Sequence, residues 1–258
     1  MPGAASLTLV ALDGIGRISP GDDLGQLILA AAGGAGLALR DGDVLAVAQK
    51  IVSKSENRYA VLADVVPSPR ALELAERCRK DPRIVELVLA ESRAVLRAVP
   101  NVLVVEDRRG LVLANAGIDR SNVEPDASGR ERALLLPVDP DASAARLRAR
   151  IRELSGADVG VLINDSVGRA WRLGTIGTAI GASGIPGLLD LRGTPDLHGR
   201  ALEITEVGFA DELAAAASAV MGQAGEGRPV VLIRGVAPAR RDGSARELQR
   251  PREQDLFR

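Results

Sequence analysis

Four short polar segments of this 258-residue chain contain the residue types that could carry chemistry. In one of them, an apolar run ending at Ile163 is followed by Asn164, Asp165 and Ser166. Strand ends are where sheets commonly place ligand groups, and carboxylate and hydroxyl oxygens are hard donors that suit Mg²⁺ or Mn²⁺. The segment could therefore hold a divalent metal. Taken alone, a solvated Asx-turn explains it equally well.

Two further segments have the same character. Residues 115–122 follow an expected strand and carry a glycine and one carboxylate, Asp119. Residues 221–228 place three glycines directly after an expected helix, with Gln223 among them. Such a loop could cradle a phosphate or a metal with its backbone, with Gln223 as an oxygen ligand, or it could be a plain helix cap and loop.

The lysines form a second signal. The chain has 30 arginines but only 3 lysines, and two of these, Lys50 and Lys54, lie in one short segment. A lysine ammonium is a compact point charge and a common phosphate ligand, which an arginine does not replace freely. Residues 49–54 are therefore a candidate anion site, although chance also explains one such pair.

The remaining polar segment, 190–200, contains the only histidine, His198. Without a second histidine or a cysteine cluster a zinc site is not expected, and His198 is interpreted as a surface or turn residue. The single cysteine, Cys78, excludes an intramolecular disulfide and is interpreted as a packing thiol in a helix, and Trp171 as a core residue. Neither a P-loop nor a dinucleotide-binding glycine motif is present.

The elements that would position these segments do not alternate regularly. Strands are expected at 6–12, 44–49, 102–105, 111–114, 159–163 and 229–233. Helices are expected at 22–39, 69–79, 81–99, 141–156 and 210–221. This order predicts an α+β fold with a mixed sheet rather than a doubly wound one. No repeat or linker divides residues 1–258, although two subdomains are compatible with the pattern, and 240–258 is expected to be a mobile charged tail.

Composition limits the function classes. The chain is 46% apolar and 26% charged, with a net charge of −1 and 2% aromatic residues. Neither the charge nor the aromatic content fits a nucleic-acid binder. No signal peptide and no membrane-spanning run is visible, so we expect no membrane association and a cytoplasmic location.

The polar segments, taken in order, resemble one family, the coenzyme F420-0:L-glutamate ligases. The chain also resembles the N-terminal half of a two-domain actinobacterial ligase whose second half is flavin-reductase-like. With no such half in these residues, we expect no flavin-dependent step and short glutamate tails. The stretches that carry the resemblance are 41–45, 49–54, Asn115-Ala116-Gly117-Ile118-Asp119, Asp165-Ser166-x-Gly168-Arg169, Gly199-Arg200 and Met221-Gly222-Gln223.

The resemblance implies one F420 glutamyl ligase domain over 1–258, an F420-ligase-like fold and an intertwined homodimer with the site near its interface. It implies that GTP phosphorylates a carboxylate of F420-0, that the amine of L-glutamate attacks the acyl phosphate, and that further glutamates could follow. It also implies two divalent cations, Mg²⁺ or Mn²⁺, and allows a K⁺ ion. The implied metal ligands are Asp119, Asp165, Ser166 and Gln223. The implied nucleotide contacts are Ile15, Gly16, Arg17, Ile18, Gln49, Lys50, Lys54, Asn122, Gly222, Ala224, Gly225, Glu226 and Gly227.

No residue is assigned as the catalytic base or nucleophile, and Gly16-Arg17 departs from the family pattern. Two alternatives stay open. One is another metal-dependent phosphotransferase or phosphatase. The other is a non-catalytic deazaflavin- or nucleotide-binding module, for which loss of Asp119 and Asp165 would be expected, yet both are present.

Overall fold

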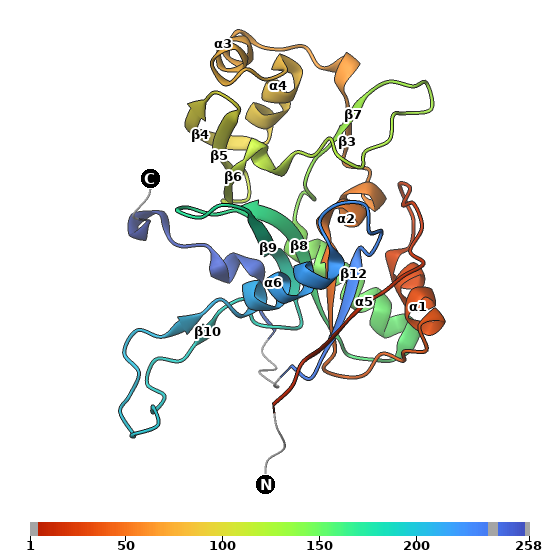
Figure 1. Cartoon of the computed structure of the whole chain (residues 1–258), viewed down its shortest axis with the longest axis vertical. Coiled ribbons are helices and arrows are strands. Elements are labelled where there is room, and N and C mark those ends of the chain that lie inside the picture. The colour runs from red at the N-terminus through yellow and green to blue at the C-terminus, as the bar shows by residue number, and fades with distance from the viewer. Residues whose placement is uncertain (1–4, 237–241, 256–258) are drawn as a thin grey trace.

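The computed structural model describes residues 5–236 and 242–255, and its larger region is built on a five-stranded sheet (Figure 1). Only the pair β2–β8 is parallel, and the other neighbours are antiparallel. In sheet order the strands are β1 (Thr8–Ala11), β12 (Val230–Arg234), β2 (Val44–Ala48), β8 (Gly160–Gly168) and β9 (Thr175–Ser183).

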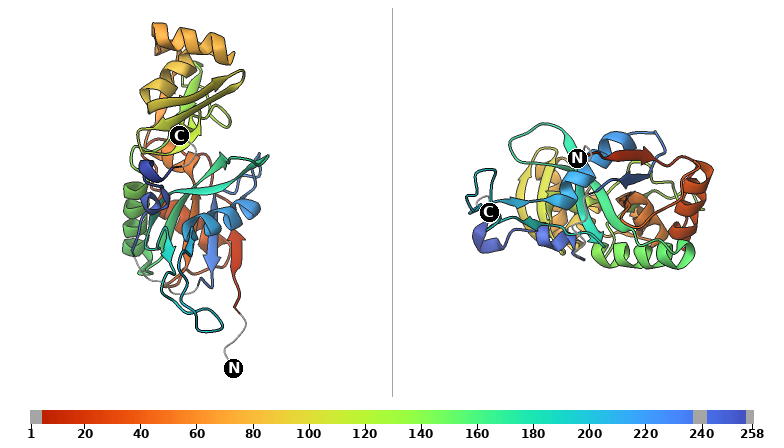
Figure 2. Two further views of the ribbon diagram at one scale, coloured as in Figure 1. Left: turned by 90° about the vertical axis from the view of Figure 1, so that its left-hand side faces the viewer. Right: turned by 90° about the horizontal axis from the view of Figure 1, so that it is seen from below.

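Helices cover both faces of this sheet, as Figure 2 shows in the view from below. Helices α1 (Leu24–Gly34) and α5 (Pro140–Ser155) pack on one face, and α6 (Phe209–Met221) packs on the other. Leu45 belongs to the core under α1 and α5, whereas its neighbour Val44 belongs to the core under α6. This alternation is the period-2 pattern of a strand buried on both faces.

The smaller region has its own core and lies above the sheet in Figure 1. Cys78 is fully buried there, which confirms the packing thiol. Its elements are α3 (Pro69–Cys78), α4 (Pro82–Ala90), and the antiparallel strands β4 (Ser92–Val99), β5 (Val102–Asp107) and β6 (Val112–Ala114).

Short elements connect the two regions and extend from them. Helix α2 (Gln49–Ser55) follows β2 without a break, and the ribbon of β3 (Tyr59–Val61) and β7 (Arg132–Leu134) leads to the smaller region. A second ribbon, β10 (Leu189–Asp190) with β11 (Glu206–Val207), projects from the larger region. The 3-10 turns are η1 (Leu62–Asp64), η2 (Asn115–Gly117), η3 (Ala245–Leu248) and η4 (Arg252–Gln254).

The structure confirms a mixed α+β fold but corrects some elements. The expected helix 81–99 is wrong in its second half, because Ser92–Val99 is strand β4, whose backbone groups pair with β5. The strand expected at 159–163 continues to Gly168, because β9 keeps pairing with β8 after β2 has ended. The glycine-rich residues around 174–187, which no pattern assigned, contain β9.

Some residues within the expected mobile tail contact the rest of the chain. Ala245 is buried, and the Glu247 carboxylate accepts hydrogen bonds from the backbone N–H groups of Gly187 and Leu188, 3.0 and 3.2 Å away. The expectation for 240, 241 and 256–258 lies outside the described residues. Within the described ranges, no helix combines the length and the apolarity needed to cross a bilayer.

Candidate functional site

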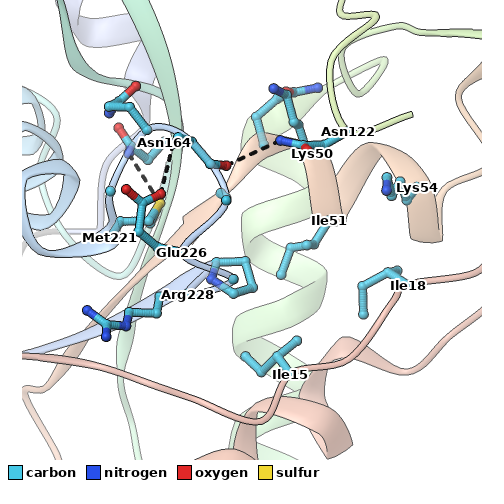
Figure 3. A pocket seen from close by; sticks show the side chains of 18 of the residues that line it. Ile15, Ile18, Lys50, Ile51, Lys54, Asn122, Asn164, Met221, Glu226 and Arg228 are labelled. Carbon is cyan, nitrogen blue, oxygen red and sulfur yellow. Dashed lines mark hydrogen bonds between the residues drawn. The ribbon is translucent and has the colours of Figure 1, made fainter. Parts of the chain in front are cut away.

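A cavity of about 590 Å³ lies where β2 and β8 stop pairing, at Ala48 and Asn164. Every residue with a predicted nucleotide or metal role lines it, and these residues come from five separated stretches of chain. Figure 3 shows Ile15 and Ile18 on one side and Met221 and Glu226 on another. Six lining residues had no assigned role: Ala48, Ile51, Asn164, Met221, Arg228 and Pro229.

Helix α2 supplies both lysines. Residues 50 and 54 are four apart, so they lie on one face of the helix, and both line the cavity. Lys50 Nζ lies 3.4 Å from Asp119 Oδ1 and donates to Ser121 Oγ at 3.0 Å. Lys54 Nζ lies 3.1 Å from Glu124 Oε2, and Lys54 is only 8% exposed. The predicted anion site therefore already holds carboxylates of the chain itself.

A left-handed turn presents Asp119. Asn115, Ala116 and Gly117 have φ values of 54°, 53° and 69°, a conformation that costs energy for the first two residues and is easy for glycine. The Asp119 backbone then exchanges two hydrogen bonds of 2.9 Å with Leu134. Ala114 pairs with Val104 before the turn, so the turn is held at both ends and the Asp119 carboxylate lies against Lys50.

Asp165 reaches the cavity from β8, one residue beyond the last pair with β2. Burial, and then the negative charge of Asp119, raise the pKa of Asp165 to about 6. A hydrogen bond from the Ser166 N–H and the positive charge of Lys50 lower this pKa, but by less. Burial also raises the pKa of Asp119, and Lys50 opposes that rise. Asp119 and Asp165 are thus two desolvated carboxylates that repel each other, and Lys50 is the one cation that acts on both. Because one positive charge faces two negative ones, the site favours an additional cation.

A chain of neutral hydrogen bonds forms the opposite wall. The Ser166 hydroxyl donates to Gln223 Oε1 at 2.5 Å, and Gln223 Nε2 donates to Ser218 Oγ at 2.5 Å. Residues alternate along β8, so Ser166 and Asn164 lie on the α6 side of the strand, opposite to Asp165. The two groups of predicted metal ligands therefore lie on the two faces of β8, just beyond its last pair with β2, and both line the cavity.

The loop after α6 needs its first glycine. Gly222 has φ 83° and ψ 172°, and a Cβ there would come 2.4 Å from Glu226 Cδ. Glu226 turns back onto the loop, and its Oε2 accepts from the Ala224 N–H at 2.8 Å. Asn122 donates to the Ala224 carbonyl at 3.4 Å, which links this loop to the one that carries Asp119 (Figure 3).

The donor set fits a hard divalent cation. The described residues contain no cluster of three or more His, Cys, Asp or Glu side chains able to hold a metal, so a metal would depend on two carboxylates, a hydroxyl and an amide oxygen. Two buried amide oxygens of the lining, Gln49 Oε1 and Asn164 Oδ1, have no hydrogen-bond partner. Such atoms are expected to gain a partner from a ligand or water.

The segment 190–200 lies outside this cavity. None of its residues is in the lining, and His198 is exposed in a turn, as expected. Trp171 is 87% exposed near the tip of the β8–β9 hairpin, so its interpretation as a core residue is wrong. Glu124 was missed, because only the fold reveals its contact with a lysine 70 positions away.

Comparison with known proteins identifies the class and then the family. The chain is 48% identical to the coenzyme F420:L-glutamate ligase of Methanopyrus kandleri, with 94% of each chain covered. It is 45% identical to the protein of that name from Methanothermobacter thermautotrophicus, covering 98% of this chain and 99% of that one. The relative from Archaeoglobus fulgidus, also so named, is 45% identical over 96% of this chain and 94% of its own.

These relatives make the chain an enzyme of the ligase class. The family described as F420-0:Gamma-glutamyl ligase matches residues 14–235, a range that contains every residue of the cavity. The chain belongs to this family.

Proposed function

We propose that this chain is a GTP-dependent ligase that joins L-glutamate to coenzyme F420-0, with addition to the monoglutamylated product as a second activity. A carboxylate oxygen of F420-0 attacks the γ-phosphorus of GTP, the bond to GDP breaks, and an acyl phosphate forms. The amine of L-glutamate then attacks the acyl carbon, an amide bond forms and phosphate leaves. The observation that carries the proposal is that one cavity combines two lysines with two interacting carboxylates.

The lysines are proposed to bind the phosphates. Phosphoryl transfer depends mostly on positioning and on neutralising the charge of the transferred group. Lys50 and Lys54 both line the cavity from one face of α2, which suits successive phosphates of a triphosphate. Each would exchange its present partner, Asp119 or Glu124, for a phosphate oxygen.

Asp119, Asp165, Ser166 and Gln223 are proposed to hold Mg²⁺ or Mn²⁺. When bound, the cations would neutralise the phosphates and polarise the acyl group. The hydrogen bond between Ser166 and Gln223 keeps two of these oxygens together, while the Ser166 N–H donates to Asp165 Oδ1 at 2.8 Å. The chain thus orders its hard oxygen donors with bonds of its own.

The nucleoside is proposed to lie between an apolar wall and the backbone of the loop 222–227. Ile15, Ile18 and Ile51 line one side and all belong to the core under α1 and α5, so this wall is firm. Gln49 Nε2 donates to Ser53 Oγ at 2.7 Å, which leaves the buried oxygen Oε1 available to a donor of the base or ribose.

Mass spectrometry of products tests the reaction. Purified protein would be incubated with GTP, Mn²⁺, L-glutamate and F420-0, with and without K⁺. The expected products are F420 with one or more added glutamates, GDP and phosphate. Phosphate release that does not require both F420-0 and glutamate would indicate a phosphatase or another phosphotransferase. Binding of nucleotide without any turnover would indicate a binding module.

A homodimer is proposed as the functional unit. Large apolar side chains project from the β8–β9 hairpin and from the segment around β10–β11, where Leu173 and Leu197 are 99% and 100% exposed. Exposed apolar groups on projecting ribbons are typical of protein–protein contacts. Sedimentation velocity should give a dimer mass, and a monomer at all concentrations would contradict the proposal.

A further inference from the structure

Helix α6 packs unusually close to β9 directly beside the candidate metal ligands. Gly177 of β9 pairs with Ser166 in the sheet register. A Cβ at Gly177 would come 2.3 Å from the Ala214 carbonyl oxygen, 2.6 Å from Ser218 Cβ and 2.7 Å from Asn164 Oδ1. Distances this short exclude any side chain, so a glycine here permits α6, with Ser218, to pack against β9 beside Asn164.

Ser218 is buried at 6% exposure and does not line the cavity. Its hydroxyl oxygen accepts from Gln223 Nε2, while Gln223 Oε1 accepts from Ser166. A glutamine amide has one oxygen and one nitrogen, and only the oxygen can bind a hard cation. Which end faces Ser166 therefore decides whether Gln223 can act as a metal ligand.

The hydrogen bonds at the two ends of the Gln223 amide define one orientation. The groups that converge on the Gly177 position together with Ser218 are both acceptors, the Ala214 carbonyl and Asn164 Oδ1, and the latter has no hydrogen-bond donor. Asn164 Oδ1 accepts no hydrogen bond, so the role of the Ser218 hydroxyl in this structure is to accept from Gln223 Nε2. Ser218 thus supplies an acceptor for the Gln223 amide nitrogen, and the amide oxygen faces Ser166.

We propose that Ser218 is a positioning residue that orients the Gln223 amide oxygen toward the metal, and that Gly177 provides the space for it. This inference rests on the proposed function, in which Gln223 is a metal ligand. Ser218 would act without touching the metal or a substrate, in the same way that outer partners orient the ligands of other metal sites.

The test measures Mn²⁺ binding directly, by electron paramagnetic resonance of the free ion during titration of purified protein without nucleotide. Ser218→Ala should weaken Mn²⁺ affinity by about ten-fold, the lower end of the range for outer partners of metal ligands. The matched control is Ser143→Ala, which removes another buried helical hydroxyl, 5% exposed, on the far face of the sheet. Ser143→Ala should leave Mn²⁺ binding unchanged.

A second background separates orientation from simple packing. In Gln223→Glu both ends of the side chain are oxygen, so its orientation no longer matters. Adding Ser218→Ala to Gln223→Glu should change Mn²⁺ affinity less than about two-fold, whereas a packing role would cost the same in both backgrounds. If Ser218→Ala does not fold, Ser218→Cys is the alternative variant. The Cys side chain has a similar volume but is only a weak hydrogen-bond acceptor, so Mn²⁺ affinity should fall by the same factor.

The outcomes distinguish this proposal from the proposed function. Tight Mn²⁺ binding by wild type and equally tight binding by Ser218→Ala would overturn the role of Ser218 alone. An equal loss in both Gln223 backgrounds would overturn it as well. A wild-type protein that binds no Mn²⁺ would overturn both the metal site and the inference.

Discussion

The two walls of the cavity are held together by different kinds of interaction. The charged wall is made of Lys50, Lys54, Asp119 and Asp165, and Glu124 pairs with Lys54 from outside the lining, so this wall consists of ion pairs and a carboxylate pair. The neutral wall is made of Ser166 and Gln223, with Ser218 behind it, and consists of hydrogen bonds between uncharged groups. A charged ligand can compete for the ion pairs of the charged wall. The neutral wall has no ion pairs to lose, so it keeps its geometry when a phosphate or a metal binds.

This difference suggests a division of labour. Partly exposed ion pairs contribute about 0–1 kcal/mol each, so a phosphate or a metal can displace them at little cost. The Gln223–Ser218 bond is anchored at a buried hydroxyl, and losing a buried hydrogen-bond partner costs about 1–3 kcal/mol. We therefore expect the charged wall to rearrange on binding and the neutral wall to be preorganised. The predictions below test this from the largest expected effect to the smallest.

The largest effect is expected from Asp165→Asn, which should reduce ligation by at least about 100-fold. The change removes a charge and a hard oxygen where the two walls meet, and both are needed to hold a divalent cation. Product formation at saturating Mn²⁺ and circular dichroism would be measured together, with Asp190→Asn, outside the cavity, as the control. Retained turnover in a folded Asp165→Asn protein would remove Asp165 from the metal site.

A pH effect is expected in the absence of metal. The folded pKa of Asp165, about 6, lies above its ordinary value of 3.8, so the folded state binds a proton more readily than the unfolded state between these values. The free energy of unfolding should therefore rise as pH falls from 6 to 4, by at most about 3 kcal/mol. Asp165→Asn should lack this contribution, being more stable than wild type at pH 7 and equal to it near pH 4.

Chemical denaturation of both proteins across this pH range checks the sign. If the free energy of unfolding depended on pH in the same way for wild type and Asp165→Asn, Asp165 would have the same pKa in the folded and unfolded states. Mn²⁺ at pH 7 should stabilise wild type and leave the variant almost unchanged, because a ligand stabilises only the state that binds it. A cation that stabilised the two proteins equally would place the metal elsewhere.

An intermediate effect is expected on the charged wall. Lys54→Ala should raise the KM for GTP by about ten-fold, because a phosphate loses its counter-charge in a partly desolvated position. Lys54→Arg should restore it only in part, since a planar fork does not fit the place of a point charge. Lys80→Ala removes the same charge outside the cavity and should leave the KM unchanged. Full activity of Lys54→Ala would make Lys54 a structural residue.

The sequence was informative where function lies in contiguous segments. Two stretches, Gln49–Ser55 and 221–227, each contain a recognisable local element together with side chains or backbone groups able to bind a ligand. Short sequence patterns were therefore enough to predict that they line the cavity. Contacts between distant segments were invisible. Strand β4 was read as helix because only its pairing with β5 decides its conformation, and the role of Ser218 depends on the absence of a side chain at Gly177.

Glu124, the partner of Lys54 in the charged wall, was indicated by no pattern, and it gives the last and smallest prediction. Its carboxylate lies 3.1 Å from Lys54 Nζ, and its side chain is 40% exposed, so it can leave the pair readily. If a phosphate takes its place on binding, Glu124→Gln should lower the KM for GTP by about two- to three-fold, because the pair opposes binding by less than about 1 kcal/mol.

Glu131→Gln is the matched control, because Glu131 pairs with Arg83 and Arg120 rather than with a lysine of the cavity. It should leave the KM unchanged. A higher KM for Glu124→Gln would mean that Glu124 acts together with the nucleotide, for instance as an acceptor for a ribose hydroxyl. The charged wall would then keep at least one of its contacts on binding, and the contrast between an exchanging wall and a preorganised wall would hold only for Lys50 and Asp119.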